Sequence, residues 1–537
     1  MTETLSPTPE EQSHVPSVLR SRRVVVQTAA LMMLLVLLCG GMGIYVLADH
    51  NLRSAYSLAA TAAEIERVYP GQINWNDMFQ RGVDGMTSIL DRYSSYLSAD
   101  QFGRLDEEFE GEYVGVGVSV IRDPAGLLVM SVRENGPAAQ AGLLTGDVIF
   151  KIGNTTLIGF DAARSIGLLR GAEGSSVTVT VFRAATSDTL TLKVSRRKLD
   201  IVHVAFAGFT PDSMLYLRVL DFEGGASRDI ESAIDSLMIE PQRRPRGLIL
   251  DLRGNPGGLF NEAYQTADLF LDKGQFIVGT ESRSRWKVEE VRANAEDITG
   301  GLPMAVLVDR GSASAAEIVS GALQKNQRAV LVGDTTFGKG LVQGFTRFSE
   351  GDGMRLTISR YFLPGHTYLN EVGSVVHDSG TGLVPDYFID FVERQPFPIG
   401  LERSLLLPKF AHAHEAEILA GDSALTIDRH LAEQFERFAR DNGFKYVSVE
   451  TEVASLIADI GRLDQAGTEV VAAAAQLVSI ARQRDSALFA EYTAYIETRL
   501  RQIAIEHRYG LYQSYARVVV KDRPDIRYAA QILKARP

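Results

Sequence analysis

Residues 201–395 alternate short apolar runs with helical stretches, and this alternation restricts the possible fold more than any other feature of the chain. The apolar runs lie at 216–220, 247–252, 276–278, 304–308 and 329–332. Short runs with few polar residues are typical of strands that are buried on both faces of a sheet. The helical stretches lie at 227–238, 261–270 and 315–323. We therefore expect an α/β core over residues 200–395.

An uncharged apolar stretch covers residues 24–48, after a polar segment at 1–23 that ends in arginines. A helix needs about 20 apolar residues to cross a bilayer, and positive charges before it favour a cytoplasmic N-terminus. We expect a transmembrane anchor in the inner membrane of a bacterial cell envelope, with the rest of the chain in the periplasm or otherwise extracytoplasmic. A cleaved signal peptide ending near Ala48 and lipidation of Cys39 are alternatives that also export the body.

Charge and cysteine content exclude several classes of protein. With 67 acidic against 55 basic residues the formal charge is -12, so phosphate would repel the chain and we expect no nucleic-acid partner. Its single cysteine allows no intrachain disulfide and no cysteine-rich zinc module.

Two helical regions flank the parts with β-type patterning. Residues 49–107 are expected to form an N-terminal helical region, and residues 396–537, rich in Ala, Leu, Glu and Arg, a C-terminal helical accessory domain without a catalytic pattern. Either region is a candidate surface for a homo-oligomer.

A small-residue turn follows the run at 304–308 and reads GSASAAEI at 311–318. Such a turn between a strand and a helix exposes a hydroxyl at the helix N-terminus, where free N–H groups favour developing negative charge. Ser314 is the candidate nucleophile and the Ala315 N–H a candidate donor to the oxyanion. Helix capping by Ser314 is the alternative interpretation of the same residue.

A lysine between glycines follows the next apolar run, where residues 333–343 read GDTTFGKGLVQ. The intervening helix carries the chain about 16 Å away and the strand returns it by a similar distance, so this loop lies near Ser314. Lys339 is a candidate general base if burial lowers its pKa from about 10.4 towards roughly 7–8. Gln343 is a candidate to orient the amine. No histidine is near Ser314 in the sequence, although His203, His366 and His377 remain possible in space.

A glycine turn at 251–258 (DLRGNPGG) links another strand to a helix. The N–H of Gly257 or Gly258 is a candidate second oxyanion donor. The turn lacks the GxGxxG spacing of a dinucleotide loop.

Residues 108–199 consist of short β-type runs between glycines with two short helices, and they resemble a PDZ domain. The resemblance rests on GVGV at 115–118, GPAAQAGL at 136–143 and GDVI at 146–149. It implies that Val116, Gly117 and Val118 bind a terminal carboxylate while the peptide adds to a strand edge.

A set of motifs in order resembles the C-terminal processing, or tail-specific, protease family. The set comprises YSSY at 93–96, the PDZ signature, the motifs at 251–258 and 311–318, GKGLVQ at 338–343 and GLVPD at 382–386. The resemblance spans about residues 91–389 and implies an α/β crotonase-like (ClpP/crotonase) core with an inserted PDZ domain. It also implies a Ser–Lys dyad, no metal or organic cofactor, and protein or peptide substrates with free apolar C-termini.

On that pattern Ser314, Lys339 and Gln343 carry over as nucleophile, base and orienting residue. Arg170 matches an arginine that couples peptide binding to alignment of the active site, although a structural role in its turn is an equal alternative. Two other functions stay open. In the first, the chain is a catalytically idle PDZ scaffold. In the second, it is an esterase in which His366 or His377 is the base that activates Ser314.

Overall fold

The computed structural model describes residues 27–28, 31–34, 50–183, 188–239, 243–282, 288–369, 381–420, 429–463 and 468–535. It divides into two units, Met1–Val83 and Asp84–Pro537. The first contains α2 (His50–Val68) and most of α3 (Trp75–Thr87). Within the described residues, no helix combines the length and the apolar character needed to cross a membrane. Most of the expected anchor at 24–48, including Cys39, lies outside them.

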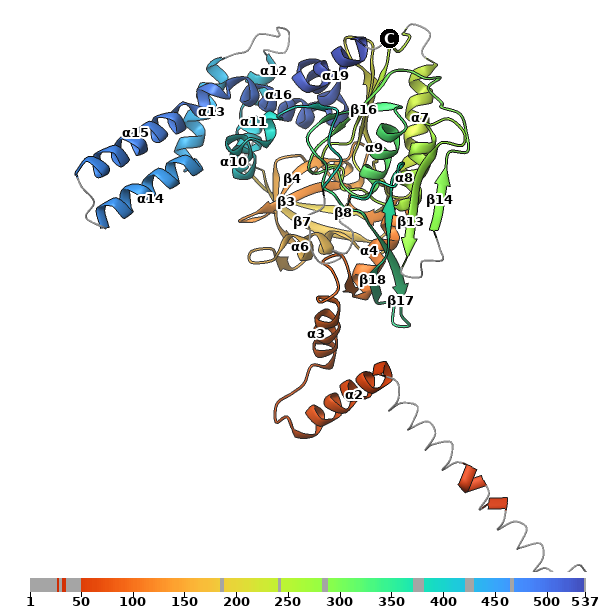
Figure 1. The fold of residues 1–537 in the computed structure, drawn as a ribbon. Helices are drawn as coiled ribbons and strands as arrows, with labels where there is room; N and C mark the ends of the chain where they lie inside the picture. The colour runs from red at the N-terminus through yellow and green to blue at the C-terminus, as the bar shows by residue number, and fades with distance from the viewer. Residues whose placement is uncertain are drawn as a thin grey trace, which may run out of the picture. The chain divides into compact units, whose positions relative to one another are not determined.

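A six-stranded sheet forms the centre of the second unit (Figure 1). Its strands in spatial order are β10 (Val204–Phe209), β11 (Leu215–Val219), β12 (Leu248–Asp251), β15 (Met304–Val308), β16 (Ala329–Gly333) and β19 (Tyr387–Phe388). All neighbours pair in parallel except β10 and β11, which are antiparallel. The expected α/β core is therefore present.

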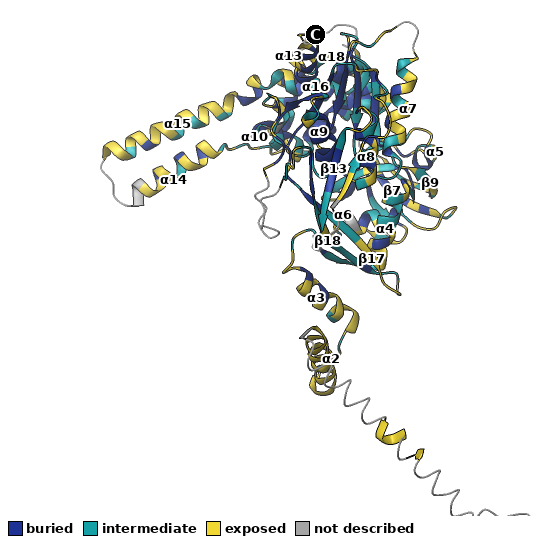
Figure 2. Cartoon of the chain, turned by 45° about the vertical axis from the view of Figure 1, so that its right-hand side comes forward, coloured by how far each residue is buried: buried dark blue, intermediate teal, exposed yellow. Residues whose placement is uncertain are grey.

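Helices cover both faces of this sheet, as the runs of apolar residues in its strands require. In β12, Leu248 and Leu250 pack towards α7 (Ala226–Met238), α8 (Phe260–Asp268) and α9 (Ala315–Lys325). Ile249 faces the opposite way, into a cluster that includes residues of α19 (Pro524–Ala535). The region that was expected to be accessory thus supplies the cover of one face of the sheet, and Figure 2 shows the dark blue, buried strands between the two layers.

A second sheet lies beside the first and carries part of the site. It contains β1 (Ser95–Leu97), β18 (Gly353–Phe362), β13 (Phe276–Ser282), β14 (Val288–Arg292) and β17 (Leu341–Arg347). The polar-aromatic turn at 91–97 ends in β1, which pairs with β18 through Ser95 and Arg355. This pairing places Tyr93 next to the loop before β17.

The PDZ region folds as a compact sheet with two helices. Its strands are β3 (Val118–Asp123), β4 (Gly126–Val132), β5 (Asp147–Ile152), β6 (Thr155–Thr156), β7 (Ser176–Arg183) and β8 (Asp188–Ser195). Its helices are α5 (Pro137–Gln140) and α6 (Ala162–Leu169). The strands β2 (Glu112–Gly115) and β9 (Arg197–Asp200) pair where the chain enters and leaves this domain. Before it lies α4 (Ala99–Glu110), capped by Ser98 and Gln101.

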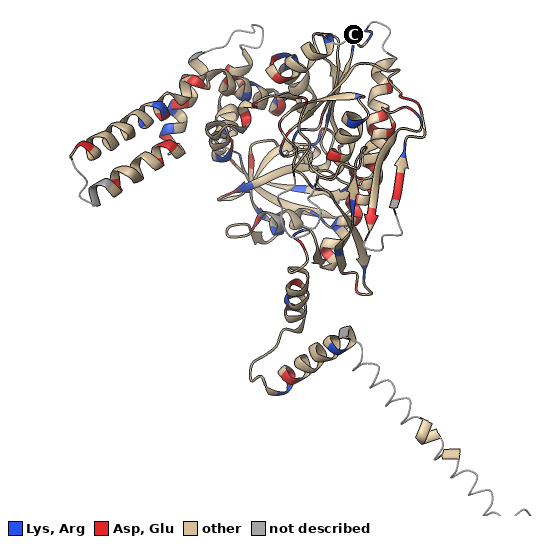
Figure 3. Cartoon of the chain, viewed as in Figure 1, with Lys and Arg blue, Asp and Glu red and all other residues tan. Residues whose placement is uncertain are grey.

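Most of the remaining helices form a separate apolar cluster and a helical hairpin. The remaining helices are α10 (Pro396–Ser404), α11 (Leu406–Ala413), α12 (Glu415–Ala420), α13 (Arg429–Asp441), α14 (Val449–Leu463), α15 (Thr468–Glu491), α16 (Thr493–Tyr509), α17 (Leu511–Ser514) and α18 (Val520–Asp522). Val520 of α18 belongs instead to the cluster that contains residues of α19. Phe397, Phe410 and Phe435 are at the centre of the cluster. The hairpin of α14 and α15 is largely exposed, and charges of both signs are interspersed along it (Figures 2 and 3).

Candidate active site

Ser314 stands at the junction of β15 and α9 in an unusual backbone conformation. Its φ of 55° and ψ of -113° lie outside the regions that most non-glycine residues adopt. Such strain persists only where the surroundings fix it, and it is common at functional sites. Here the turn is held by Ser312, whose hydroxyl donates to the Leu252 carbonyl at 2.7 Å. The sharp turn leaves the Ser314 hydroxyl at the start of α9.

Lys339 lies in the loop between β16 and β17, which returns to the start of α9 as the sequence predicts. The Phe337 N–H donates to the Ser312 carbonyl at 3.0 Å, which ties the two loops together. Lys339 Nζ lies 4.8 Å from the centroid of the Tyr93 ring, and no hydrogen bond to Ser314 Oγ is present between these two described residues. The turn at 91–97 therefore provides an aromatic surface for the amine.

The pKa of Lys339 is lowered to about 8. Burial is the main cause, because it disfavours the charged amine, and the nearby charges of Arg355 and Arg92 add to the effect. Glu317 and Asp91 oppose it. A lysine with this pKa is neutral in a useful fraction of molecules near neutral pH, as a general base requires.

Glu317 joins the two loops, a role that was not predicted from the sequence. Its side chain is fully buried. One carboxylate oxygen accepts from the backbone N–H of Ser314 and of Lys339, both at 2.9 Å. The other accepts from the Thr336 hydroxyl at 2.5 Å and the Gly338 N–H at 2.7 Å. A glutamate three residues after a helix-capping serine was the available signal, but its reach to the lysine loop depends on the fold.

The pKa of Glu317 is raised by burial, and the hydrogen bonds from its four donors counteract part of that rise. These donors span both segments that carry the candidate dyad. Glu317 therefore fixes the position of the nucleophile turn relative to the lysine loop.

The glycine turn after β12 brings backbone N–H groups to Ser314. A Cβ on Gly257 would lie 2.8 Å from Ser314 Cβ, so only glycine fits against the nucleophile. The Gly257 N–H donates to Asn255 Oδ1 at 2.9 Å, and Gly257 does not line the cavity. Gly258 and Ala315 do line it. Of the three predicted oxyanion donors, Gly257 packs against Ser314, whereas Gly258 and Ala315 line the cavity that Ser314 also lines.

One cavity of about 380 Å³ brings together Ser314, Lys339 and Gln343. Gln343 lies on β17, where its side-chain amide donates to Thr357 Oγ1 at 3.4 Å. The cavity has no histidine among its lining residues within the described part of the chain. His203 is paired with Asp221, His366 stacks on Phe362, and His377 lies outside the described residues.

The PDZ region contains a second cavity of about 460 Å³, lined by Val116, Gly117, Val118 and Arg170. It lies between β3, an edge strand of the PDZ sheet, and α6. Arg170 follows α6 and forms an ion pair with Glu107 on α4. The four predicted residues thus share one groove, beside an edge to which an extended peptide can add.

Comparison with known proteins identifies the family. A family model described as peptidase family S41 matches residues 213–386, and a PDZ-domain model matches residues 113–194. The carboxy-terminal-processing protease of Bartonella bacilliformis is 33% identical over 355 residues, which cover 65% of this chain and 78% of that protein. The chain belongs to peptidase family S41. The prediction of a serine-type C-terminal-processing peptidase with a PDZ domain is confirmed.

The chain is also similar to other C-terminal processing proteases. The carboxy-terminal processing protease CtpA of Bacillus subtilis is 29% identical over 325 residues, covering 60% of this chain and 68% of that protein. Among solved structures, the photosystem II D1 C-terminal processing protease is 26% identical with a TM-score of 0.36, and the match covers 60% of this chain and 84% of that chain.

In this S41 peptidase the cavity that contains Ser314 and Lys339 adjoins the PDZ groove. Glu108, Glu223 and Pro256 line both. The pKa of Glu223 is raised to about 8, first by burial and then by the charges of Glu108 and Asp221. Burial likewise raises the pKa of Glu108, against the charge of Arg170. The wall shared by the two cavities therefore contains two glutamates whose pKa values are raised by burial.

Proposed function

We propose that this S41 peptidase hydrolyses peptide bonds with a Ser–Lys dyad formed by Ser314 and Lys339. One observation carries the proposal: a serine on a strained turn at a helix N-terminus shares a cavity with a half-buried lysine of lowered pKa. The same cavity has no lining histidine among the described residues. This favours Lys339 as the base over the alternative of an esterase with a histidine base.

In the acylation step, neutral Lys339 takes the proton of the Ser314 hydroxyl while Oγ attacks the scissile carbonyl carbon. The oxyanion that forms accepts hydrogen bonds from the N–H groups of Gly258 and Ala315. The Lys339 ammonium then gives its proton to the leaving amine, and the C–N bond breaks. An acyl-enzyme remains on Ser314, and Lys339 is neutral again.

In the second step, Lys339 takes a proton from water, and the resulting hydroxide attacks the ester carbonyl. Breaking of the ester bond releases a new C-terminus, and the proton on Lys339 returns to Ser314 Oγ. Gln343, which lines the same cavity, would orient the amine.

Tyr93 gives Lys339 two positions in this cycle. Its ring attracts the ammonium, as the 4.8 Å separation reflects, but it does not attract a neutral amine in this way. Loss of the proton therefore releases Nζ from the ring and lets it turn to Ser314. Burial and the charge of Arg355 favour that loss.

The PDZ groove would bind the free C-terminus of a protein substrate, with an apolar last residue against Val116 and Val118. Its common wall with the catalytic cavity supports a direct path from capture to cleavage. Arg170, which lies between groove and α4, is placed to couple the two through its ion pair with Glu107.

The location and the class of the core also belong to this proposal. The apolar stretch at 24–48 supports a membrane anchor, with the catalytic unit outside the cytoplasm in the bacterial envelope. Helices on both faces of a largely parallel sheet, with the nucleophile at a strand-to-helix turn, support a crotonase-like core. Exposed apolar residues on α14 and α15, such as Leu456, Ile457 and Ile480, support a homo-oligomer.

Hydrolysis of an unstructured protein with an apolar C-terminus tests the chemistry. We expect cleavage by the wild type and a loss of about 10³-fold or more in kcat for Ser314→Ala and for Lys339→Ala. Lys325→Ala, an exposed lysine at the other end of α9, is the matched control and should cleave normally. Full activity of Lys339→Ala would favour the esterase with a histidine base. A wild type that binds but does not cleave would favour the idle scaffold.

A further inference from the structure

A buried network of ion pairs lies directly below the candidate oxyanion turn. Its centre is Asp251, the fully buried last residue of β12. Asp251 accepts from the Tyr216 hydroxyl at 2.6 Å and from Arg253 Nε at 2.8 Å, and it forms an ion pair with Arg218. Burial would raise the pKa of Asp251, but the charges of Arg253 and Arg218 outweigh it and hold the pKa well below its ordinary value.

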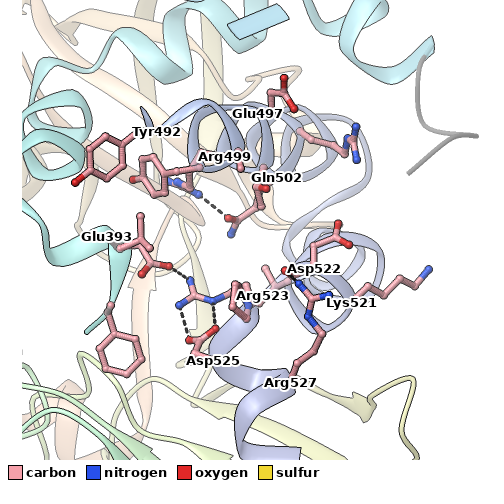
Figure 4. A pocket seen from close by; sticks show the side chains of 18 of the residues that line it. Glu393, Tyr492, Glu497, Arg499, Gln502, Lys521, Asp522, Arg523, Asp525 and Arg527 are labelled. Atoms are coloured by element: carbon pink, nitrogen blue, oxygen red, sulfur yellow. Dashed lines mark hydrogen bonds and ion pairs between the residues drawn. The ribbon is translucent and has the colours of Figure 1, made fainter. Parts of the chain in front are cut away.

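The C-terminal region completes this network across 272 residues of sequence. Asp525, in the first turn of α19, forms an ion pair with Arg253. Arg523 pairs with Asp525 at 2.7 Å and also with Glu393. Figure 4 shows Arg523 reaching both carboxylates on the wall of a cavity of about 830 Å³.

Charge balance makes Asp525 a necessary part of the network. Three carboxylates, from Asp251, Asp525 and Glu393, face three guanidinium groups, from Arg218, Arg253 and Arg523. Arg253 is only 11% exposed, so little water screens it. Removing the charge of Asp525 leaves an uncompensated cation, which is unfavourable in a buried site.

Arg253 begins the turn that leads to Gly258. The next residue, Gly254, donates its N–H to Asp309 Oδ1 at 2.8 Å, and the Asn255 carbonyl accepts from the Ala313 N–H at 3.0 Å. The turn is thus held at one end by Asp525 through Arg253 and along its length by the nucleophile turn. A shift of Arg253 would therefore move the start of the turn, and the position of this turn determines where the N–H of Gly258 lies.

We propose that Asp525 is a positioning residue for the oxyanion turn and that α19 is therefore part of the catalytic machinery. The inference rests on the proposed function, since the turn matters for hydrolysis only if it stabilises the oxyanion. The anchoring of α19 does not depend on Asp525, because Ile526, Ala529 and Leu533 are buried against the sheet. Loss of the carboxylate should therefore loosen the turn without detaching the helix.

The full-length chain with Asp525→Asn tests this inference in the hydrolysis assay. We expect kcat to fall by about 10- to 100-fold with KM unchanged, because misplacement of an oxyanion donor weakens binding of the transition state more than that of the substrate. Asp525→Glu should recover part of kcat, since it restores the charge. The control is Asp212→Asn, which removes the partly exposed Asp212–Lys534 ion pair at the other end of the same helix and should keep the wild-type kcat.

Hydrogen exchange of residues 252–259 provides a readout that does not require activity. Exchange in this segment should be faster in Asp525→Asn than in the wild type and in Asp212→Asn. An inactive wild type would remove the proposed function, but the exchange result would still decide whether Asp525 holds the turn. Unchanged exchange, or a kcat equal to that of the wild type or lowered equally by Asp212→Asn, would overturn the inference.

Discussion

The pH dependence of hydrolysis follows from the environment of Lys339. With the ordinary lysine pKa of 10.5, only about one molecule in 3,000 would carry a neutral amine at pH 7. At the pKa of about 8 the fraction is about one in eleven, so the environment raises the population of the active base by about 300-fold. Because kcat/KM follows this fraction, it should rise about tenfold between pH 7 and pH 9, with a midpoint near pH 8.

Arg355→Met tests the origin of that midpoint. The charge of Arg355 lowers the pKa of Lys339, so its removal should raise that pKa and move the midpoint to higher pH. Activity at pH 7 should fall and recover in alkaline buffer. Arg360→Met is the matched control, since Arg360 lies on the same strand but pairs with Glu281.

The assay is hydrolysis of a fluorogenic peptide with a free apolar C-terminus, measured from pH 6 to pH 10 below saturation. A midpoint near the histidine value of about 6.5 would refute the assignment of Lys339 as the base. A midpoint that Arg355→Met leaves in place would refute the electrostatic explanation of the shift.

Three further predictions concern other parts of the site. Glu317→Ala removes the acceptor of four donors and should lower the free energy of unfolding by about 3 kcal/mol or more, measured by urea denaturation; an unchanged midpoint would contradict this role. Gly257→Ala should abolish hydrolysis but retain binding of a labelled peptide, because its Cβ would meet Ser314 Cβ at 2.8 Å; normal turnover would show that the turn tolerates a side chain. Amidation of the peptide's C-terminus should weaken its binding to the groove at Gly117 by about tenfold in a fluorescence titration, and equal affinity would argue against carboxylate recognition.

Local patterns were sufficient to predict the elements that carry the candidate dyad. The apolar run of β15 and the small residues after it predict a strand-to-helix turn at Ser314. The parallel pairing of β15 with β16 returns Lys339 to the same edge, as chain lengths alone suggest. These predictions depend on segments adjacent in sequence, where geometry leaves few alternatives.

Contacts between distant segments were not predictable in this way. Which glycine is available as an oxyanion donor depends on the side chain of Asn255, which accepts from the Gly257 N–H, whereas Gly258 lines the cavity. Arg253 and Asp525 form an ion pair although they lie far apart in the sequence, and no periodic pattern links the two positions. Composition indicated a helical C-terminal region, but it does not show which helices pack on the catalytic sheet.

The position of α19 has a consequence for the timing of biosynthesis. The second face of the catalytic sheet stays exposed until the ribosome has translated as far as residue 535 and that stretch has emerged. A nascent chain that already contains Ser314 and Lys339 thus lacks a finished core. We therefore expect hydrolysis to begin only after α19 has been made and has packed against the sheet.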